Sequence, residues 1–333
     1  MTETARDRAK VKVSLGIPNC REGRLHPVGT VTPDWMRLVA QLAEDLNYYS
    51  LWLNEFPDTE PSVRASFAEG PRYYDPLAVI ADLAARTERI RFLTATLVLP
   101  EHAPLLLGRQ ASTLNSLTNG RVSIGVGLGG SKEEYRRLHG ELDTPNRGAM
   151  MDDFLGALNA YRTNPLEGYS GKYVEFDAIH TGKLPSDDQL PIFVAGASAS
   201  VFPRIARYAD GWIDSHHSPD EIHDALNSLT EIFASTGRKE SPIVLRQFNV
   251  SLAPTQDRAD ALVDEILGEG AAARPPSGVD RRLIGTPEAI STRLTEYVDA
   301  GVSEICAIFF GKDVNAVTDQ IRMFTDQVLP KLR

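Results

Sequence analysis

The feature that most constrains this chain is a regular alternation of short apolar runs with longer helical patterns. Many of the helical segments begin with a polar residue followed by proline, as at Thr32–Pro33 and Asp75–Pro76, which is a typical helix start. Continuous apolar strands that alternate with helices indicate a parallel sheet covered by helices. The expected strands are residues 11–17, 51–53, 90–99, 121–128, 191–195, 211–214, 243–252 and 305–310.

Eight strand–helix units in 333 residues predict a single (β/α)8 TIM barrel, an α/β fold, with long insertions in the loops that follow the strands. We expect residues 1–10 to be a disordered lead and residues 11–333 to form one barrel domain. An open, doubly wound sheet is the alternative. Three long irregular stretches, 54–72, 164–189 and 269–285, are expected at the face that carries the active site in such barrels.

Charge and cysteine content narrow the classes of function. The chain has 35 basic and 45 acidic residues, and this net charge of −10 argues against a nucleic-acid binder. Cys20 and Cys306 lie far apart, so we expect free thiols in a reducing cytosol, with a single disulfide as the alternative. No apolar run is long enough for a membrane span, and Met1–Lys10 does not resemble a signal peptide. These patterns predict a cytoplasmic protein with no membrane or nucleic-acid partner.

In a barrel, the residues just past each strand converge on one site. They include small residues, hydroxyls, two adjacent histidines and a few charged groups. The sequence shows no residue spacing typical of a zinc site and no Ser-His-Asp order. Chemistry carried by an organic cofactor is therefore the simplest explanation. The candidates for the substrate pocket are Asn19, Phe56, His217, Arg246 and Phe309, and those for catalysis are His102, His216 and Arg282.

Two short motifs suggest how a flat, anionic ligand would be held. Gly125, Gly127 and Gly129 alternate, so they share one face of a strand where missing side chains leave room for a flat ring. Tight packing inside the barrel is the alternative explanation. Residues 195–200 join a strand to a helix, and their small side chains and hydroxyls suit a phosphate. A plain helix cap by Ser198 or Ser200 is the alternative there.

Residues 74–130 resemble the bacterial luciferase-like flavin monooxygenases, and the resemblance extends from about Val11 to Leu332. It rests on DPLAVIADLAARTERIRF, on LTATLVLP followed by HAPLLLGRQASTLNSLTNGRVSIGVGLGG, on Arg147–Gly148, and on LPIFVAGAS, IARYADGWI, IGTPEAISTRL and VLPKL. The combination of an NSLTNGR segment with a GVGLG strand is more specific than either piece alone.

The resemblance implies a barrel that binds FMN, or the 5-deazaflavin coenzyme factor 420, at the carboxyl ends of the strands. It also implies a cis peptide bond at Ala95–Thr96 and a mobile lid over residues 278–285 that contains Arg281 and Arg282. The cofactor-binding residues expected on this basis are Glu55, Thr94, Ala95, Thr96, Gly127, Gly129, Ser131, Gly196, Ala197, Ser198 and Ser200.

Two departures from the family pattern limit what the resemblance implies. Luciferase and the deazaflavin-dependent glucose-6-phosphate dehydrogenases carry a histidine after the acidic residue that ends the second strand, whereas Phe56 follows Glu55 here. The arginine that holds the phosphate in luciferase falls near Leu106, with Arg109 one turn away. These differences argue against both specific activities.

The main expectation is therefore a monooxygenase that uses reduced FMN and O2 to oxygenate a small organic substrate. A separate NAD(P)H-dependent flavin reductase would supply the reduced FMN, and the family resemblance implies a homodimer. The first alternative is a hydride-transfer oxidoreductase that depends on factor 420. The second is a non-catalytic, flavin-binding partner subunit.

Overall fold

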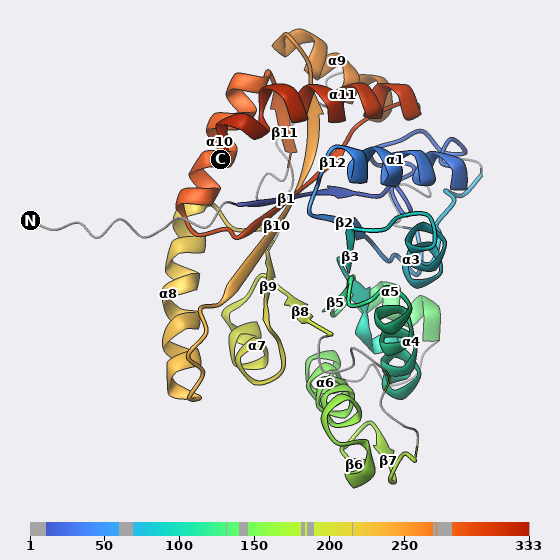
Figure 1. Ribbon diagram of the computed structural model, residues 1–333, viewed down its shortest axis with the longest axis vertical. Helices are drawn as coiled ribbons and strands as arrows, with labels where there is room; N and C mark the ends of the chain where they lie inside the picture. Colours follow the sequence, from blue (N-terminus) through green and yellow to red (C-terminus); the bar gives the residue numbers. More distant parts are fainter. Residues whose placement is uncertain are drawn as a thin grey trace, which may run out of the picture.

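Eight parallel strands close into a barrel, which confirms the predicted (β/α)8 fold (Figure 1). Around the barrel the order is β1-β2-β3-β5-β8-β9-β10-β12, and β12 pairs with β1 to close it. The strands are β1 (Lys12–Gly16), β2 (Ser50–Leu53), β3 (Arg91–Thr94), β5 (Val122–Gly127), β8 (Ile192–Ala195), β9 (Gly211–Asp214), β10 (Ile243–Leu252) and β12 (Glu304–Phe309).

The computed structural model describes residues 11–59, 69–130, 132–139, 146–180, 184, 190–214, 216–268, 271 and 282–332. The predicted lead at residues 1–10, together with Ser131 and residues 278–281 of the predicted lid, lies outside these ranges. Within the described residues, no helix is both long enough and apolar enough to cross a membrane.

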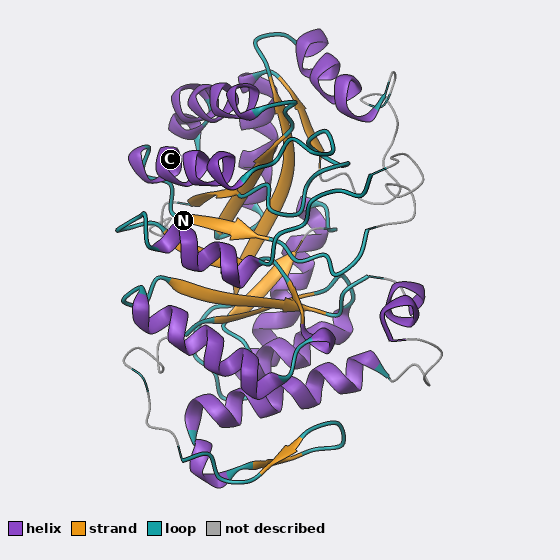
Figure 2. Ribbon diagram, turned by 90° about the vertical axis from the view of Figure 1, so that its right-hand side faces the viewer, coloured by secondary structure: helices purple, strands orange, loops and turns teal. Residues whose placement is uncertain are grey.

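Helices surround the barrel, as Figure 2 shows from the side. Thr32, Asp75, Ser218 and Thr286 each accept a hydrogen bond from a backbone N–H in the first turn of the helix that follows. Such caps contribute about 1 kcal/mol each. The helices are α1 (Pro33–Asp45), α3 (Pro76–Ala84), α4 (Pro104–Leu117), α5 (Lys132–His139), α6 (Arg147–Thr163), α7 (Phe202–Tyr208), α8 (Pro219–Ser235), α9 (Gln256–Leu267), α10 (Pro287–Asp299) and α11 (Val314–Gln327).

The hydrophobic core has two layers, because each strand is buried on both faces. The larger layer lies between strands and helices and includes Phe92, Val126 and Phe248. The smaller layer fills the inside of the barrel, the lumen, with side chains such as Trp52 and Phe193. Cys20 and Cys306 are free and buried, and Cys306 belongs to the lumen layer.

Three local features differ from the sequence-based expectations. The run at residues 90–99 is interrupted, so that β3 is followed by a two-residue strand β4 (Leu97–Val98) and a 3-10 turn η1 (Leu99–Glu101). The irregular stretch 164–189 contains a hairpin of β6 (Tyr169–Ser170) and β7 (Glu175–Phe176), which lies beside α6 (Figure 1). Residues 282–285, expected in a mobile lid, form β11 (Arg282–Gly285), a strand parallel to the end of β10.

Candidate active site

At the end of β2, Glu55 and His102 form a closely packed pair. His102 Nε2 lies 3.0 Å from each carboxylate oxygen of Glu55, and the two side chains are only 17% and 14% exposed, respectively. The Val98 N–H also donates to this carboxylate. Burial lowers the pKa of His102, but the hydrogen bond to Glu55 and the negative charges of Glu55, Asp75 and Glu101 outweigh it, so the pKa is raised overall. The pair therefore favours a protonated imidazole.

A network of buried amides fixes the loops around this pair. Asn19 donates from Nδ2 to the carbonyls of Asn54 and Tyr74 at 2.7 and 2.9 Å, and its Oδ1 accepts from the Asn54 N–H at 3.1 Å. The Asn54 side chain in turn donates to the carbonyl of Ala95 and accepts from the Arg21 guanidinium. These contacts link the ends of β1, β2 and β3.

The Ala95–Thr96 peptide bond is cis, at the predicted position. Thr94, just before it, is fully buried, and its hydroxyl donates to the carbonyl of Gly125 and accepts from its N–H, both at 2.9 Å. This hydroxyl bridges β3 and β5 at the point where β3 ends. Thr94 therefore braces the strands, and its side chain is already engaged with the backbone.

Beyond Thr94, three small residues from neighbouring strands meet, and we call Thr96, Gly127 and Ala195 the site floor. A Cβ at Gly127 would lie 2.8 Å from Thr96 Oγ1 and 3.8 Å from the Ala195 Cβ. The floor adjoins the acidic pair, because the Glu55 N–H donates to the Thr96 carbonyl at 3.3 Å. The floor therefore consists of backbone and very small side chains.

The three alternating glycines have different surroundings. A Cβ at Gly125 would lie 2.2 Å from the Thr94 carbonyl oxygen and 2.6 Å from Ile213 Cδ1, so tight packing accounts for this glycine. Gly129 lies beyond the strand with a φ of +76° and is exposed. Of the three, only Gly127 lies on the site floor.

On β10, one buried acceptor among the described residues lacks a hydrogen-bond partner. Asn249 Oδ1 is buried and has no hydrogen bond. Its neighbours Phe248 and Val250 belong to the layer between strands and helices, so strand alternation directs Asn249 to the lumen side of β10. Because a buried polar atom without a partner is costly, this atom is suited to a bound molecule or a water.

The segment after β8 is exposed at Ala197, Ser198 and Ser200 and half-buried at Gly196. The hydroxyls of Ser198 and Ser200 lie 2.6 Å apart, and neither caps the following 3-10 turn. The Gly196 carbonyl accepts from the indole N–H of Trp212 at 2.9 Å, which anchors the segment to β9. The helix-cap explanation is therefore not supported, and the backbone and hydroxyls here face outward.

After β9, Asp214 contacts an arginine and a histidine. The Asp214 and Arg246 side chains are fully buried and form an ion pair, and His217 Nδ1 lies 2.6 Å from the other carboxylate oxygen of Asp214. Arg246 also lies 3.4 Å from the hydroxyl of Tyr297 on α10. His216 is exposed and its backbone N–H donates to Asp214 Oδ1 at 3.1 Å, whereas His217 contacts Asp214 through its ring.

Several residues assigned to the substrate or catalysis point elsewhere. Arg246 shares the outward face of β10 with Phe248, and Phe309 packs on Phe324 of α11 with ring centroids 5.6 Å apart, so both belong to the layer between strands and helices. Asn19 is fully engaged by backbone groups. Arg282 lies on β11, where it donates to the Ala271 carbonyl at 2.9 Å. Phe56 remains at the site, half-buried.

The structure adds charged groups that the sequence patterns did not single out. Arg21 is 4% exposed beside Asn54, and the Arg24 guanidinium lies 4.6 Å from the Phe56 ring centroid. The Glu134 carboxylate fills the space that a side chain at Gly130 would take. Burial, helped by Asp58 and Glu101, raises the pKa of Glu134. The one available signal was that Arg21 and Arg24 closely follow the first strand.

Comparison with known proteins shows to which family the chain belongs. The family described as luciferase-like monooxygenase matches residues 12–304. This chain belongs to that family. An uncharacterised protein of Mycobacterium tuberculosis (strain ATCC 25618 / H37Rv) is 30% identical over 229 residues, which cover 68% of this chain and 75% of the relative.

Two solved structures of luciferase-like fold illustrate the range of chemistry on this scaffold. The oxygenating constituent of 3,6-diketocamphane monooxygenase from Pseudomonas putida, in complex with FMN, has a TM-score of 0.74 at 17% identity, covering 97% of this chain and 99% of that one. An F420-dependent secondary alcohol dehydrogenase, in complex with an F420–acetone adduct, has a TM-score of 0.75 at 16% identity, covering 98% and 100%. At these identities the likeness concerns the fold, and the luciferase-like family membership supports an oxidoreductase.

Proposed function

We propose that this luciferase-like protein is a flavin-dependent monooxygenase that uses reduced FMN and O2 to oxygenate a small organic substrate. The observation that carries the proposal is the site floor of Thr96, Gly127 and Ala195, which is poor in side chains and continuous with Glu55. A flat ring needs such a surface, and the FMN-containing monooxygenase of similar fold adds support. When bound, reduced FMN supplies the reaction with O2.

The residues present fit this cofactor. A Cβ at Gly127 would lie 2.8 Å from Thr96 Oγ1 and 3.8 Å from the Ala195 Cβ, so glycine leaves the floor without a further side chain at this point. Asn249 Oδ1 offers a buried polar atom without a partner on the lumen side. The exposed segment 196–200 offers backbone N–H groups and two hydroxyls to a phosphate. In this proposal the ring binds over the site floor and the phosphate at this segment.

The proposal gives Glu55 and His102 the task of holding a proton beside the ring. The imidazole is protonated more readily than an ordinary histidine because Glu55 pairs with it, and both are largely shielded from water. A proton held at His102 Nε2 is positioned by two carboxylate oxygens at 3.0 Å. Since acid–base groups act best with a pKa near the working pH, this pair is the best-placed proton donor among the described residues.

Equilibrium dialysis of the protein with oxidised and with anaerobically reduced FMN tests the proposal. We expect saturable binding of the reduced form, and oxygen uptake that is linked to modification of a substrate in a screen of ketones, aldehydes and aromatic compounds. Absence of FMN binding in both redox states would refute it.

A hydride-transfer enzyme that depends on factor 420 is the second candidate, because an F420-dependent dehydrogenase has a similar fold. The two candidates differ in their reaction with oxygen. Binding of factor 420 in place of FMN, with substrate reduction or oxidation but without oxygen uptake, would favour this alternative. The separate flavin reductase, the homodimer, the cytoplasmic location and the non-catalytic partner role remain predictions.

A further inference from the structure

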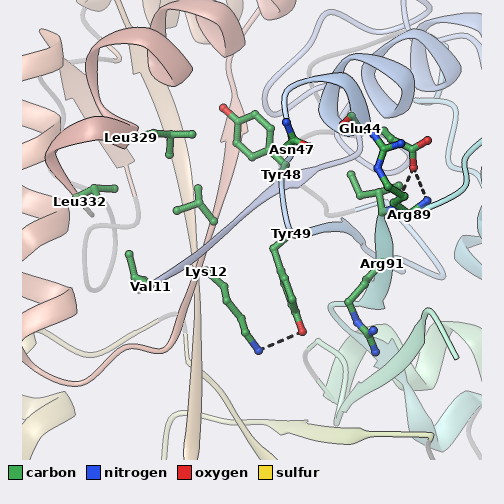
Figure 3. Close-up of a pocket in the computed structure, with 12 residues that line it drawn as sticks. Val11, Lys12, Glu44, Asn47, Tyr48, Tyr49, Arg89, Arg91, Leu329 and Leu332 are labelled. Atoms are coloured by element: carbon green, nitrogen blue, oxygen red, sulfur yellow. Dashed lines mark hydrogen bonds between the residues drawn. The ribbon is translucent and has the colours of Figure 1, made fainter. Parts of the chain in front are cut away.

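A cavity lies at the opposite end of the barrel from the site floor. It has a volume of about 680 Å³ and opens where β1 begins, between the end of α1 and the C-terminal turn η5 (Leu329–Lys331). Figure 3 shows Lys12 and Tyr49 side by side, with Arg91 next to them and Leu329 and Leu332 on the far wall. This volume lies in the range of small-molecule sites.

The polar side of this cavity is positively charged although the protein as a whole carries −10. Lys12 Nζ donates to the Tyr49 hydroxyl at 3.1 Å and lies 4.3 Å from the centre of its ring. The Arg91 guanidinium lies 5.9 Å from the same ring and donates to the Gly120 carbonyl at 3.0 Å. Among the described residues, no ion pair joins Lys12 or Arg91 to a carboxylate, and both cations lie against the Tyr49 ring.

The carboxylate in the lining of this cavity is already engaged. Glu44 also lines the cavity, but its oxygens accept the backbone N–H groups of Glu88, Arg89 and Ile90 at 2.8–3.0 Å. These hydrogen bonds turn the Glu44 carboxylate toward the loop at 88–90. Arg89 adds a third cation to the lining. An anion that enters the cavity therefore meets more positive than negative charge.

The opposite wall is apolar, with Val11, Leu329 and Leu332. A smaller cavity of about 250 Å³ shares Lys12, Tyr49 and Arg91 and is also lined by the buried lumen residues Phe193 and Leu245. Trp52 and Ile213 are further buried side chains of the lumen layer. A molecule in the cavity therefore does not reach the site floor, and the two sites are separate.

We propose that the cavity at the amino-terminal end of the barrel binds a small molecule that carries a phosphate or carboxylate group on a short apolar body. Lys12, Tyr49 and Arg91 hold the anionic group, and Val11, Leu329 and Leu332 contact the body. Charge complementarity and the division into a cationic and an apolar wall together select this class of ligand.

Isothermal titration of the full chain with hexyl phosphate, hexanoate and hexan-1-ol tests the proposal. We expect one binding site for at least one of the two anions, with a Kd of about 1 mM or lower, and much weaker binding of the neutral alcohol. The stronger of the two anions identifies the head group. Lys12→Ala and Arg91→Gln should each weaken binding about fivefold. Tyr49→Phe, which keeps the ring, should cause a smaller loss.

The control is Lys312→Ala, which removes an exposed lysine after β12, at the other end of the barrel. It should bind the anion as the unaltered protein does. The anion should also bind equally well when saturating FMN is present, or when FMN does not bind at all, so this test is independent of the proposed function. Three results would overturn the proposal. They are the absence of binding by both anions, unchanged affinity in folded Lys12→Ala and Arg91→Gln proteins, and displacement of the anion by FMN.

Discussion

Gly125 and Gly127 form a matched pair that separates a packing role from a binding role. In Gly125→Ala, the new methyl would lie 2.2 Å from the Thr94 carbonyl oxygen and 2.6 Å from Ile213 Cδ1. Because a backbone oxygen moves only with its strand, we expect a loss of about 1–3 kcal/mol in the free energy of unfolding. In Gly127→Ala, the nearest atom is the Thr96 hydroxyl at 2.8 Å, which is able to rotate away.

Stability and binding should therefore respond in opposite ways at the two positions. Gly127→Ala should remain within about 1 kcal/mol of the unaltered protein, since alanine also lowers the entropy of the unfolded chain. Its methyl group would stand where the ring is proposed to bind, and overpacking of this size weakens FMN binding about tenfold or more. Urea unfolding and equilibrium dialysis with FMN measure the two effects. Unchanged FMN affinity in folded Gly127→Ala would refute the assignment of the site floor.

Three further substitutions test the polar interactions. Glu55→Gln should lower the pKa of His102, which Glu55 raises in the unaltered protein. The stability that a raised histidine pKa contributes is fully present below the ordinary value of about 6.5 and is lost as the pH rises through the raised value. The stability difference between the variant and the unaltered protein should therefore shrink as the pH rises above about 6.5, and a constant difference in urea unfolding would contradict this. Asp214→Asn should cost about 3–5 kcal/mol in the free energy of unfolding by removing the buried carboxylate that pairs with Arg246. A double variant with Arg246→Met should lose less in the same assay. Glu44→Ala should cost about 1–3 kcal/mol by removing the acceptor for three backbone N–H groups, whereas Glu44→Gln should retain most of the thermal stability.

The barrel was predictable because its signals are local. Thr32–Pro33 and Asp75–Pro76 cap and start helices in the structure as their sequence indicates, and the strand expected at residues 211–214 has those bounds. The point at which the run at 90–99 is interrupted was less predictable. It depends on the Thr94 hydroxyl, which bonds to the backbone of Gly125, a residue 31 positions away.

The direction of side chains was the least predictable feature. Strands buried on both faces carry apolar residues on both sides, so alternation of apolar and polar residues does not tell which side faces the lumen. Arg246 and Phe309 were therefore predicted to line the pocket. In the structure both side chains point away from the lumen, toward the helices. Arg21 was missed because its buried partner, Asn54, lies 33 residues along the chain. Separation along the chain also hides the contrast between Gly125 and Gly127, which depends on Ile213 and Ala195 from other strands.

A crystal structure of the protein grown with FMN under reducing conditions tests the central claim most directly. The account predicts the flavin ring against Thr96, Gly127 and Ala195, with Glu55 and His102 beside it and the phosphate at residues 196–200. Density for FMN at any other place, with the site floor covered by protein side chains, would contradict it.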